Sequence, residues 1–237
     1  MSHDPTLAEI VNAQPAAARI LERHQLDYCC GGKQRLRTAC DAAGVDPEDV
    51  LAELATLMPQ PEPDWATMTP SLLVDHLEAT HHAYLHAEFT RMSALAEKVE
   101  GVHGLRHPEL AQVRAAYEEL RADLEPHLTK EERVLFPMIR ELARPTTAPD
   151  VRGGSLQDPV RVMLTEHDRA GEVLARLRSL TADYTTPADG CASYHALYDG
   201  LQELEADTHL HIHKENNVLF PAVIALEQRL AVGGGVS

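Results

Sequence analysis

Residues 127–137 read HLTKEERVLFP, and residues 211–221 read HIHKENNVLFP. Both stretches contain His-x-x-x-Glu, and both continue with Val-Leu-Phe-Pro soon after the glutamate. His82 and His167 precede the two stretches at almost equal intervals. The repeat predicts two pairs of helices, each supplying one His and one His-x-x-x-Glu to a common centre. Four-helix bundles hold two metal ions with ligand sets of this kind.

The candidate ligands lie on the apolar stripes of four predicted long helices, traced in steps of three and four residues. The first stripe contains His82, Leu85, Phe89, Met92, Ala96 and Val99. The second contains Leu110, Val113, Tyr117, Leu120, Leu124, His127, Glu131, Val134 and Met138. The third contains Val160, Leu164, His167, Gly171 and Leu174. The fourth contains Tyr194, Leu197, Leu201, Leu204, Thr208, His211, Glu215, Val218 and Ala222.

Buried carboxylates distinguish a metal centre from an ordinary core. A single histidine on an apolar stripe is more often a hydrogen-bonded core residue than a ligand. Glu131 and Glu215, however, lie on stripes with no nearby Lys or Arg, and burying a carboxylate without a cation costs on the order of several kcal/mol. A pair of metal ions supplies the missing charge. The predicted metal ligands are His82, His127, Glu131, His167, His211 and Glu215.

The ligand chemistry indicates which metal such a centre takes. Imidazole with carboxylate suits iron, manganese or zinc, whereas a structural zinc site is expected to use thiolates. Two glutamates shared by two metals indicate bridging carboxylates. With an added oxo or hydroxo bridge, one position on each metal stays open. Adjacent open positions on iron would favour O₂ or NO binding, redox chemistry and release of the metal.

Composition favours an all-α protein and excludes several classes of partner. Hydrophobic residues make up 44% of the 237 residues and aromatic residues only 4%, a balance typical of helices rather than sheets. The formal charge of −16 at pH 7 disfavours nucleic acid and anionic membranes. The sequence has no apolar run suited to a membrane span and no signal-peptide pattern at its start. Four cysteines do not indicate a disulfide framework, and we expect a cytoplasmic protein.

The chain divides into two predicted domains. Residues 1–58 contain short helical patterns over 7–11, 16–24 and 34–43, and a further helix begins at Asp46-Pro47. A proline-rich linker is predicted over 59–67. Residues 68–237 are expected to form the four-helix bundle. Because the short N-terminal helices bury little by themselves, dimerisation through this domain is a plausible expectation.

Two motifs together resemble one known family. The His82, His127-x-x-x-Glu131, His167 and His211-x-x-x-Glu215 pattern resembles the hemerythrin-like domain of the iron-sulfur cluster repair di-iron proteins. The sequence DYCCGG at residues 27–32 resembles the signature of the small domain that precedes it in that family. The resemblance implies two non-haem iron ions, four terminal histidine ligands, bridging Glu131 and Glu215, and repair of clusters damaged by nitric oxide or oxidants. The partners it implies are damaged iron-sulfur proteins.

Cys29 and Cys30 allow two interpretations. They precede Gly31-Gly32, where backbone N–H groups and Lys33 would lower a thiol pKa and make it reactive. The pair would then hand over electrons or iron, which we favour. The alternative is that both are small buried side chains in a tight turn. Cys40 and Cys191 are expected to be structural.

None of the remaining histidines is expected to be a metal ligand. His86, one turn from His82, is expected to support a ligand or to line an access path. His103 shares the stripe of His82 but lies about 31 Å further along a continuous helix, so it approaches only if the helix breaks near Gly101. His209 and His213 are expected to point away from His211 and to be solvated or to support a ligand. Surface or capping roles are expected for His3, His24, His76, His81, His107 and His195.

Three prolines are expected to shape the helices near the site. Pro126, directly before His127, would bend the second helix and aim that ligand. Pro137 and Pro221, each six residues after a glutamate, would kink or tighten the helix ends. Alternatively, each proline marks only a local irregularity of its helix.

Three functions are compatible with this pattern. The first is a di-iron protein that supplies iron to damaged clusters. The second is an enzyme, a reductase of NO or O₂ that receives electrons from an unknown donor through the cysteine pair. The third is an NO or O₂ sensor or carrier, which would not need the cysteine-containing domain.

Overall fold

The computed structural model describes residues 4–58, 65–144 and 155–233. Every regular element in these ranges is helical, and they contain no strand. The prediction of an all-α fold is therefore confirmed. The proline-rich part of the predicted linker, residues 59–64, lies outside the described residues, as does His3. Its last residues form a short 3₁₀ helix, Trp65–Thr67, in which Trp65 is buried.

The predicted short helices are present at the N-terminus. They are α1 (Leu7–Ala13), α2 (Ala17–Arg23), α3 (Leu36–Ala43) and α4 (Pro47–Leu54). Thr6 and Glu9 form a reciprocal capping box that starts α1. Asp46 caps α4 through the N–H of Glu48, with Pro47 in the first helical position. Gly44 ends α3 at a φ of 70°, a conformation that glycine adopts without strain.

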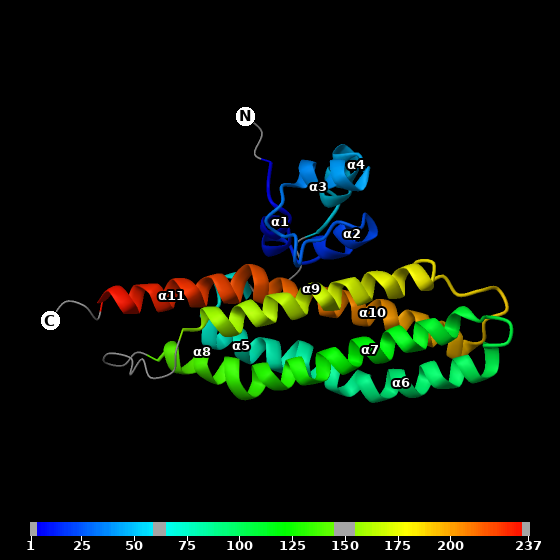
Figure 1. Ribbon diagram of the computed structural model, residues 1–237. Helices are drawn as coiled ribbons and strands as arrows, with labels where there is room; N and C mark the ends of the chain where they lie inside the picture. The colour runs from blue at the N-terminus through cyan, green and yellow to red at the C-terminus, as the bar shows by residue number, and fades with distance from the viewer. Residues whose placement is uncertain (1–3, 59–64, 145–154, 234–237) are drawn as a thin grey trace. The chain divides into compact units, whose positions relative to one another are not determined.

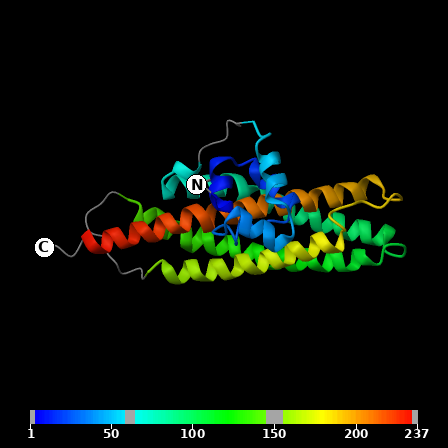
Figure 2. The same ribbon diagram turned by 90° about the horizontal axis from the view of Figure 1, so that it is seen from above.

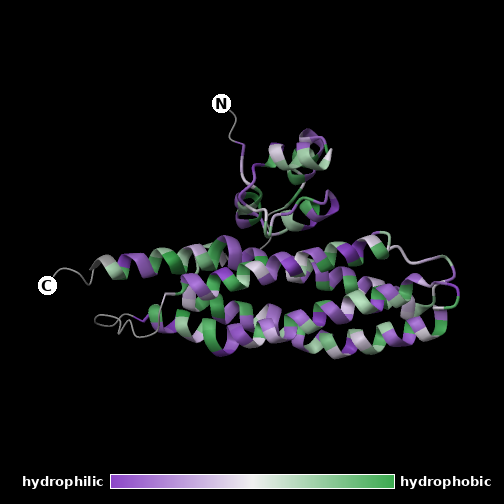
Figure 3. Ribbon diagram, in the orientation of Figure 1, coloured by the Kyte–Doolittle hydropathy of each residue, from purple (hydrophilic) through white to green (hydrophobic). Residues whose placement is uncertain are grey.

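Four long helices follow. They are α6 (Ala83–His103), α7 (Glu109–Lys130), α9 (Gln157–Leu180) and α10 (Ala192–Lys214). Shorter α5 (Pro70–Leu77) precedes α6, α8 (Phe136–Leu142) continues α7, and α11 (Phe220–Gly233) continues α10. Figures 1 and 2 show the four long helices running alongside one another in both views. Hydrophobic and hydrophilic residues alternate along them in Figure 3, as expected for helices with one buried face.

Side chains from adjacent helices hold this bundle together. Helix α7 packs against both α6 and α9. A Cβ atom at Gly200 of α10 would lie 2.7 Å from the sulfur of Met92 on α6, so these two helices approach closely and a larger residue would require the Met92 side chain to move. Buried Glu205 on α10 accepts hydrogen bonds from Arg178 on α9. The four-helix bundle predicted from the stripes is therefore confirmed.

Within the residues that the structure describes, three π-helical turns interrupt the helices. They span Glu78–His82, Glu131–Leu135 and Glu215–Leu219. In the second, the N–H of Phe136 donates to the carbonyl oxygen of Glu131. Phe220 and Glu215 are joined in the same way in the third. A π-turn holds one more residue than an α-helical turn and is often found at functional sites.

The two Val-Leu-Phe-Pro motifs explain where two of these turns fall. A proline lacks an N–H, and its ring meets the carbonyl four residues earlier in an α-helix. In both copies the π-turn ends just before Phe-Pro, so Pro137 and Pro221 come second in α8 and α11. Proline is tolerated in a first helical turn. The prediction that these prolines affect helix ends was wrong, because the helices continue beyond them.

The chain forms two compact units. One comprises Met1–Val74, Ile139–Leu156 and His209–Ser237, and the other comprises Asp75–Met138 and Gln157–Thr208. The division at residues 58 and 68 stays a prediction. In the described ranges, no helix combines the length and the apolar character needed to cross a membrane.

Candidate metal centre

The predicted ligands fall into two groups of buried side chains that could hold metal ions. The first group is His82, Glu131, His211 and Glu215, and the second is His127, Glu131, His167 and Glu215. Within each group, one ligand atom from every residue lies within 4.8 Å of the others. Both glutamates occur in both groups, which is the pattern expected of carboxylates shared by two metals.

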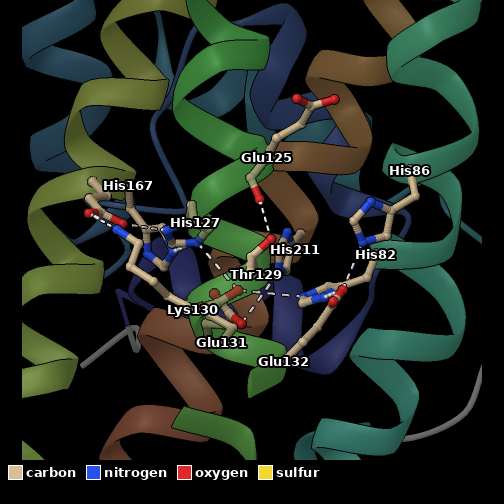
Figure 4. Close-up of polar contacts among 12 residues, drawn as sticks. His82, His86, Glu125, His127, Thr129, Lys130, Glu131, Glu132, His167 and His211 are labelled. Atoms are coloured by element: carbon tan, nitrogen blue, oxygen red, sulfur yellow. Dashed lines mark hydrogen bonds and ion pairs between the residues drawn. The ribbon is translucent and has the colours of Figure 1, made fainter. Parts of the chain in front are cut away.

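Glu131 lies between two of the histidines. Its Oε2 atom is 3.5 Å from Nε2 of His82 and 3.4 Å from Nε2 of His127. Nε2 of His127 is in turn 3.2 Å from Nε2 of His167. Figure 4 shows these three histidines, which come from different helical segments, turned toward Glu131. The Glu215 carboxylate has the same relation to His211, with Oε1 lying 3.3 Å from Nε2.

The π-turns position these side chains. His82 is the last residue of one π-turn, and Glu131 and Glu215 are the first residues of the other two. Glu131 follows His127 by four positions with α-helical spacing, so both side chains share one face. The extra residue falls only after the glutamate. The π-turns at Glu131 and Glu215 therefore leave each His-x-x-x-Glu pair intact and change the direction of the side chains that follow.

Two carboxylates orient the histidines from outside the candidate ligand set. Oε1 of Glu132 lies 3.0 Å from Nδ1 of His82 and 2.8 Å from Nε2 of His86. Oε2 of Glu166 lies 2.9 Å from Nδ1 of His127, and Lys130 also donates to Glu166. A carboxylate at Nδ1 keeps the proton on that nitrogen, which leaves the Nε2 lone pair directed at Glu131. Sequence reasoning missed Glu132 and Glu166.

The charges agree with this arrangement. Hydrogen bonding by His127 and then by Lys130 lowers the pKa of Glu166 to about 2, although partial burial opposes the shift. Partial burial also raises the pKa of Glu132, but hydrogen bonds with His86 and His82 hold it below its ordinary value. Both carboxylates are therefore ionised at neutral pH. The prediction that His86 supports a ligand agrees with its contact to Glu132.

The residues fit a metal centre by two observations. Glu131 and Glu215 are 0% exposed, and buried carboxylates require nearby positive charge. The Nε2 atoms of His127 and His167 face each other, and carboxylate hydrogen bonding at Nδ1 of His127 makes its Nε2 an acceptor. Imidazole and carboxylate without thiolate suit iron, manganese or zinc. The assignment of the individual ligands stays a prediction.

Comparison with known proteins agrees with these features. The family model described as the hemerythrin HHE cation binding domain matches residues 72–223. The iron-sulfur cluster repair protein YtfE of Enterobacter sp. (strain 638) is 36% identical over 225 residues, covering 94% of this chain and 98% of that protein. This chain belongs to the YtfE family of hemerythrin-like proteins.

Both domains of the family are represented. A second model, ScdA_N, described as a domain of unknown function (DUF542), matches residues 3–58. The protein of the same name from Escherichia coli O157:H7 is 36% identical over 226 residues, with the same 94% and 98% coverage. The resemblance inferred from the sequence is therefore confirmed. The hemerythrin HHE match contains all six candidate ligands, and the ScdA_N match contains the cysteine pair.

Asp27 shapes the cysteine-containing turn of this family member. Its Oδ1 accepts hydrogen bonds from the backbone N–H groups of Cys29 and Cys30, and its Oδ2 accepts from that of Gly31. Cys29 is buried and Cys30 is half-buried. Asp27, Cys29 and Cys30 also place one potential ligand atom each within 4.8 Å of one another. The turn therefore combines a buried thiol with a more accessible one.

The expectation of a lowered thiol pKa is wrong for Cys29. The pKa of Cys29 is raised well above its ordinary value, first by the hydrogen bond with Cys30 and then by burial. The charges of Cys30 and Asp27 raise it further. The backbone N–H groups that were expected to stabilise a thiolate are instead bound to Asp27. Cys29 is a neutral thiol at physiological pH.

The C-terminal part of the second repeat contacts this turn. Nδ2 of Asn217 donates to the carbonyl oxygen of Cys29 at 2.9 Å. The ring nitrogens of His213 lie 3.1 Å from the carbonyl oxygen of Tyr28 and 2.9 Å from Oδ1 of Asn12. His213 is 0% exposed, and burial lowers its pKa to about 4. His213 therefore packs against the cysteine turn as a neutral ring, and the expectation that it is solvated was wrong.

Of two further histidines, one differs from its expected role and the other agrees with it. His81 is buried and its Nδ1 lies 2.8 Å from Asp207, so it is not a surface residue. Helix α6 continues through Gly101 to His103, which leaves His103 far from the candidate ligands. Nε2 of His103 instead lies 3.2 Å from the sulfur of Cys191. Cys40 is buried as expected, whereas Cys191 is exposed and was wrongly expected to be structural.

Proposed function

We propose that this protein repairs iron-sulfur clusters damaged by nitric oxide or oxidants, and that it does so by supplying iron from a carboxylate-bridged di-iron centre. The proposal rests on one combination of observations. The chain has two buried groups of His and Glu side chains that could hold metal ions, and its relatives are named iron-sulfur cluster repair proteins. Those relatives, named iron-sulfur cluster repair proteins, match 94% of the chain. The hemerythrin HHE match gives the domain a cation-binding role.

The six predicted residues would hold the two ions. His82, His127, His167 and His211 would each direct Nε2 to a metal, and Glu131 and Glu215 would bridge. Iron bound there would supply redox chemistry and a metal that exchanges with a client protein. Damaged iron-sulfur proteins are the proposed partners, with NO or O₂ as small-molecule ligands.

The surrounding residues support this role by fixing protonation states. Glu132 and Glu166 hold protons on Nδ1 of His82 and His127, so that Nε2 is ready to bind a cation without first losing a proton. His86 is half-exposed and shares Glu132 with His82. Its imidazole lies at the edge of the buried ligand group, where it contacts the Glu132 carboxylate that also bonds His82.

Metal analysis tests the centre itself. We expect about two irons per chain, coupled to each other in the Mössbauer spectrum, in protein purified without added metal. Zinc in their place, or iron that remains mononuclear, would contradict the di-iron proposal. Replacing Glu131 with Gln should abolish the coupled signal, and replacing the exposed Glu172 on α9 with Gln should leave it unchanged.

Transfer of labelled iron tests repair. The reduced protein, loaded with ⁵⁷Fe, is incubated with a nitrosylated cluster protein, and the client is then separated and measured for restored cluster and label. We expect label in the restored cluster without catalytic NO consumption. Sustained NO turnover with an added electron donor, and no label in the client, would instead identify the protein as a reductase.

The cysteine pair is tested in the same assay. We propose that Cys29 and Cys30 pass electrons or iron during repair, with Cys30 as the more accessible thiol. Replacing both with Ser should impair transfer while leaving the iron spectrum unchanged. Full transfer by the double variant would refute this role for the pair. The Cys40→Ser variant is the matched control because it removes a buried thiol from the same N-terminal region.

A further inference from the structure

Cys191 and His103 form a pair outside the candidate metal centre. Cys191 is exposed and immediately precedes α10, and His103 is the last residue of α6. The Cys191 sulfur lies 3.2 Å from Nε2 of His103. A continuous helix places His103 about 31 Å along the axis from His82. The two residues therefore belong to a separate location in the bundle.

The surroundings of His103 set which nitrogen carries its proton. The side chain is only 3% exposed, and Nδ1 has no hydrogen-bond partner among the described residues. A buried N–H without an acceptor is unfavourable, so the neutral ring keeps its proton on Nε2. That N–H points to the Cys191 sulfur. The Tyr194 ring packs against the imidazole of His103, with the two ring centroids 5.2 Å apart.

Helix α10 stabilises the same sulfur. The hydrogen bond with His103 and those with the backbone N–H groups of Tyr194 and Ser193 lower the pKa of Cys191 to about 7. Such groups at a helix N-terminus favour a thiolate.

The nearby acidic groups have their own partners. His107 Nδ1 lies 3.1 Å from Glu109, and its Nε2 lies 2.9 Å from Asp189. Arg106 also pairs with Asp189, at 3.4 Å. Hydrogen bonding with Asp189 and then with Glu109 raises the pKa of His107, and this ring and Arg106 partly offset the two carboxylates that would otherwise oppose a negative charge on Cys191.

We propose that Cys191, activated by His103, is a site of reversible thiol modification that forms mixed disulfides with uncharged low-molecular-weight disulfides. The Cys191 thiolate attacks one sulfur of the disulfide, a new S–S bond forms and the old one breaks. The departing thiolate takes a proton from water. Cys191 is oxidised and half of the disulfide is reduced, so the exchange is balanced.

Two features define the class of reactant. Cys29, Cys30 and Cys40 belong to the other compact unit, so Cys191 has no second cysteine in its own unit with which to close a disulfide. The formal charge of −16 repels anionic disulfides. A thiol with a pKa near the ambient pH is also the best attacking group in thiol-disulfide exchange.

The test measures modification of each cysteine in the full-length protein. The protein reacts with 2-hydroxyethyl disulfide across a range of pH, and peptide mass spectrometry quantifies each adduct. We expect rapid modification of Cys191, half-maximal near pH 7. Failure of Cys191 to react at neutral pH, with adducts only at Cys30, would overturn the proposal.

Variants of His103 separate activation from simple exposure. His103→Leu should raise the pH midpoint by about 1–2 units and slow modification at about pH 6 by about five- to tenfold, because the loss of thiolate outweighs the higher nucleophilicity of a more basic thiol. The control is His195→Leu, at an exposed position on α10, which should leave the midpoint unchanged. An unchanged midpoint in a folded His103→Leu protein would also refute activation by His103.

A second variant decides the matter if His103→Leu does not fold. Gln keeps an N–H donor, so His103→Gln should give a midpoint between that of the parent protein and the ordinary thiol value. A midpoint identical to the parent's, with His103 absent, would show that exposure and the helix terminus alone account for reactivity.

Discussion

Glu166 on α9 lies 2.9 Å from Nδ1 of His127 on α7, so a candidate ligand is oriented by a carboxylate from a different helix. Lys130, one turn after His127, donates to the same carboxylate. Glu166 thus joins the two helices and fixes the protonation state of the ligand at the same time. Because the contact is outside the six candidate ligands, it can be altered without removing a donor atom.

Replacing Glu166 with Gln should weaken iron binding by about 10–100-fold, the usual effect of removing a carboxylate behind a ligand histidine. The amide is neutral and favours the Nδ1–H form of His127 less strongly. Competition with a chelator of known affinity measures the change. Glu172→Gln, which neutralises an exposed carboxylate on the same helix, is the control, and equal affinities in the two variants would contradict the orienting role.

Iron should stabilise the folded protein through Glu131. The carboxylate is 0% exposed, and a ligand that binds only the folded state at 100 times its Kd stabilises by about 2.7 kcal/mol. We expect added ferrous iron to raise the thermal unfolding midpoint of the parent protein but not that of Glu131→Gln. Calorimetry under anaerobic conditions measures both, and an equal rise in the two proteins would show that Glu131 is not needed for binding.

Gly32 should not tolerate a side chain. A Cβ there would lie 2.6 Å from both Oδ1 of Asn217 and the carbonyl oxygen of Tyr28. We expect Gly32→Ala to destabilise the protein by about 1–3 kcal/mol, as overpacking does elsewhere. A Cβ at Gly171 on α9 would meet no atom within 4 Å, so Gly171→Ala should stabilise by about 0.5–1 kcal/mol. Urea unfolding compares them, and a neutral Gly32→Ala would argue against the close packing of this turn.

Alkylation should distinguish Cys29 from Cys30. The pKa of Cys29 is raised by its hydrogen bond with Cys30, by burial and by the charges of Cys30 and Asp27. A raised pKa keeps this thiol protonated until the pH exceeds that value, so Cys29 should react with iodoacetamide more slowly than Cys30 at about pH 8. Asp27→Asn removes one nearby charge and should accelerate Cys29 alkylation.

Peptide mass spectrometry measures both rates. Asp49→Asn, at an exposed position of α4, removes the same charge at a distance and serves as the control. Equal rates for Cys29 and Cys30 in the parent protein would show that Cys29 is not a buried, protonated thiol.

The stripes predicted the bundle because burial repeats regularly along a helix. Tracing failed where that repeat changes. Val134 was expected in the core but is 53% exposed, and Leu135 is buried instead. The π-turn that starts at Glu131 adds a residue and rotates every later side chain. Val218 is likewise only half-buried, whereas Leu219 is buried.

The third stripe failed for a different reason. Leu164 was expected inside but is exposed, and Met163 is buried. Both residues lie within a regular helix, and steps of three or four from Val160 reach either one. A single sequence does not decide between two apolar neighbours at the edge of a stripe.

The contacts between helices were not predictable from spacing. Glu132 and Glu166 are each adjacent in sequence to a predicted ligand, but the histidine that each one orients lies on another helix. The sequence showed only that a glutamate is the neighbour of Glu131 and another is the neighbour of His167. The Cys191–His103 pair likewise joins residues far apart in the chain, and nothing in the apolar stripes relates them.

The π-turns at Glu131 and Glu215 make each of these helices a composite of two phases. The segment before the turn presents the ligands, and the segment after it presents a differently rotated apolar face beginning with Leu135 or Leu219. Substitutions that repack the later segment therefore need not rotate the ligand pair. Conversely, deleting one residue directly after either glutamate would restore α-helical spacing and place Leu135 or Leu219 three positions after the ligand, still on its buried face, whereas Val134 or Val218, two positions after it, would still face outward.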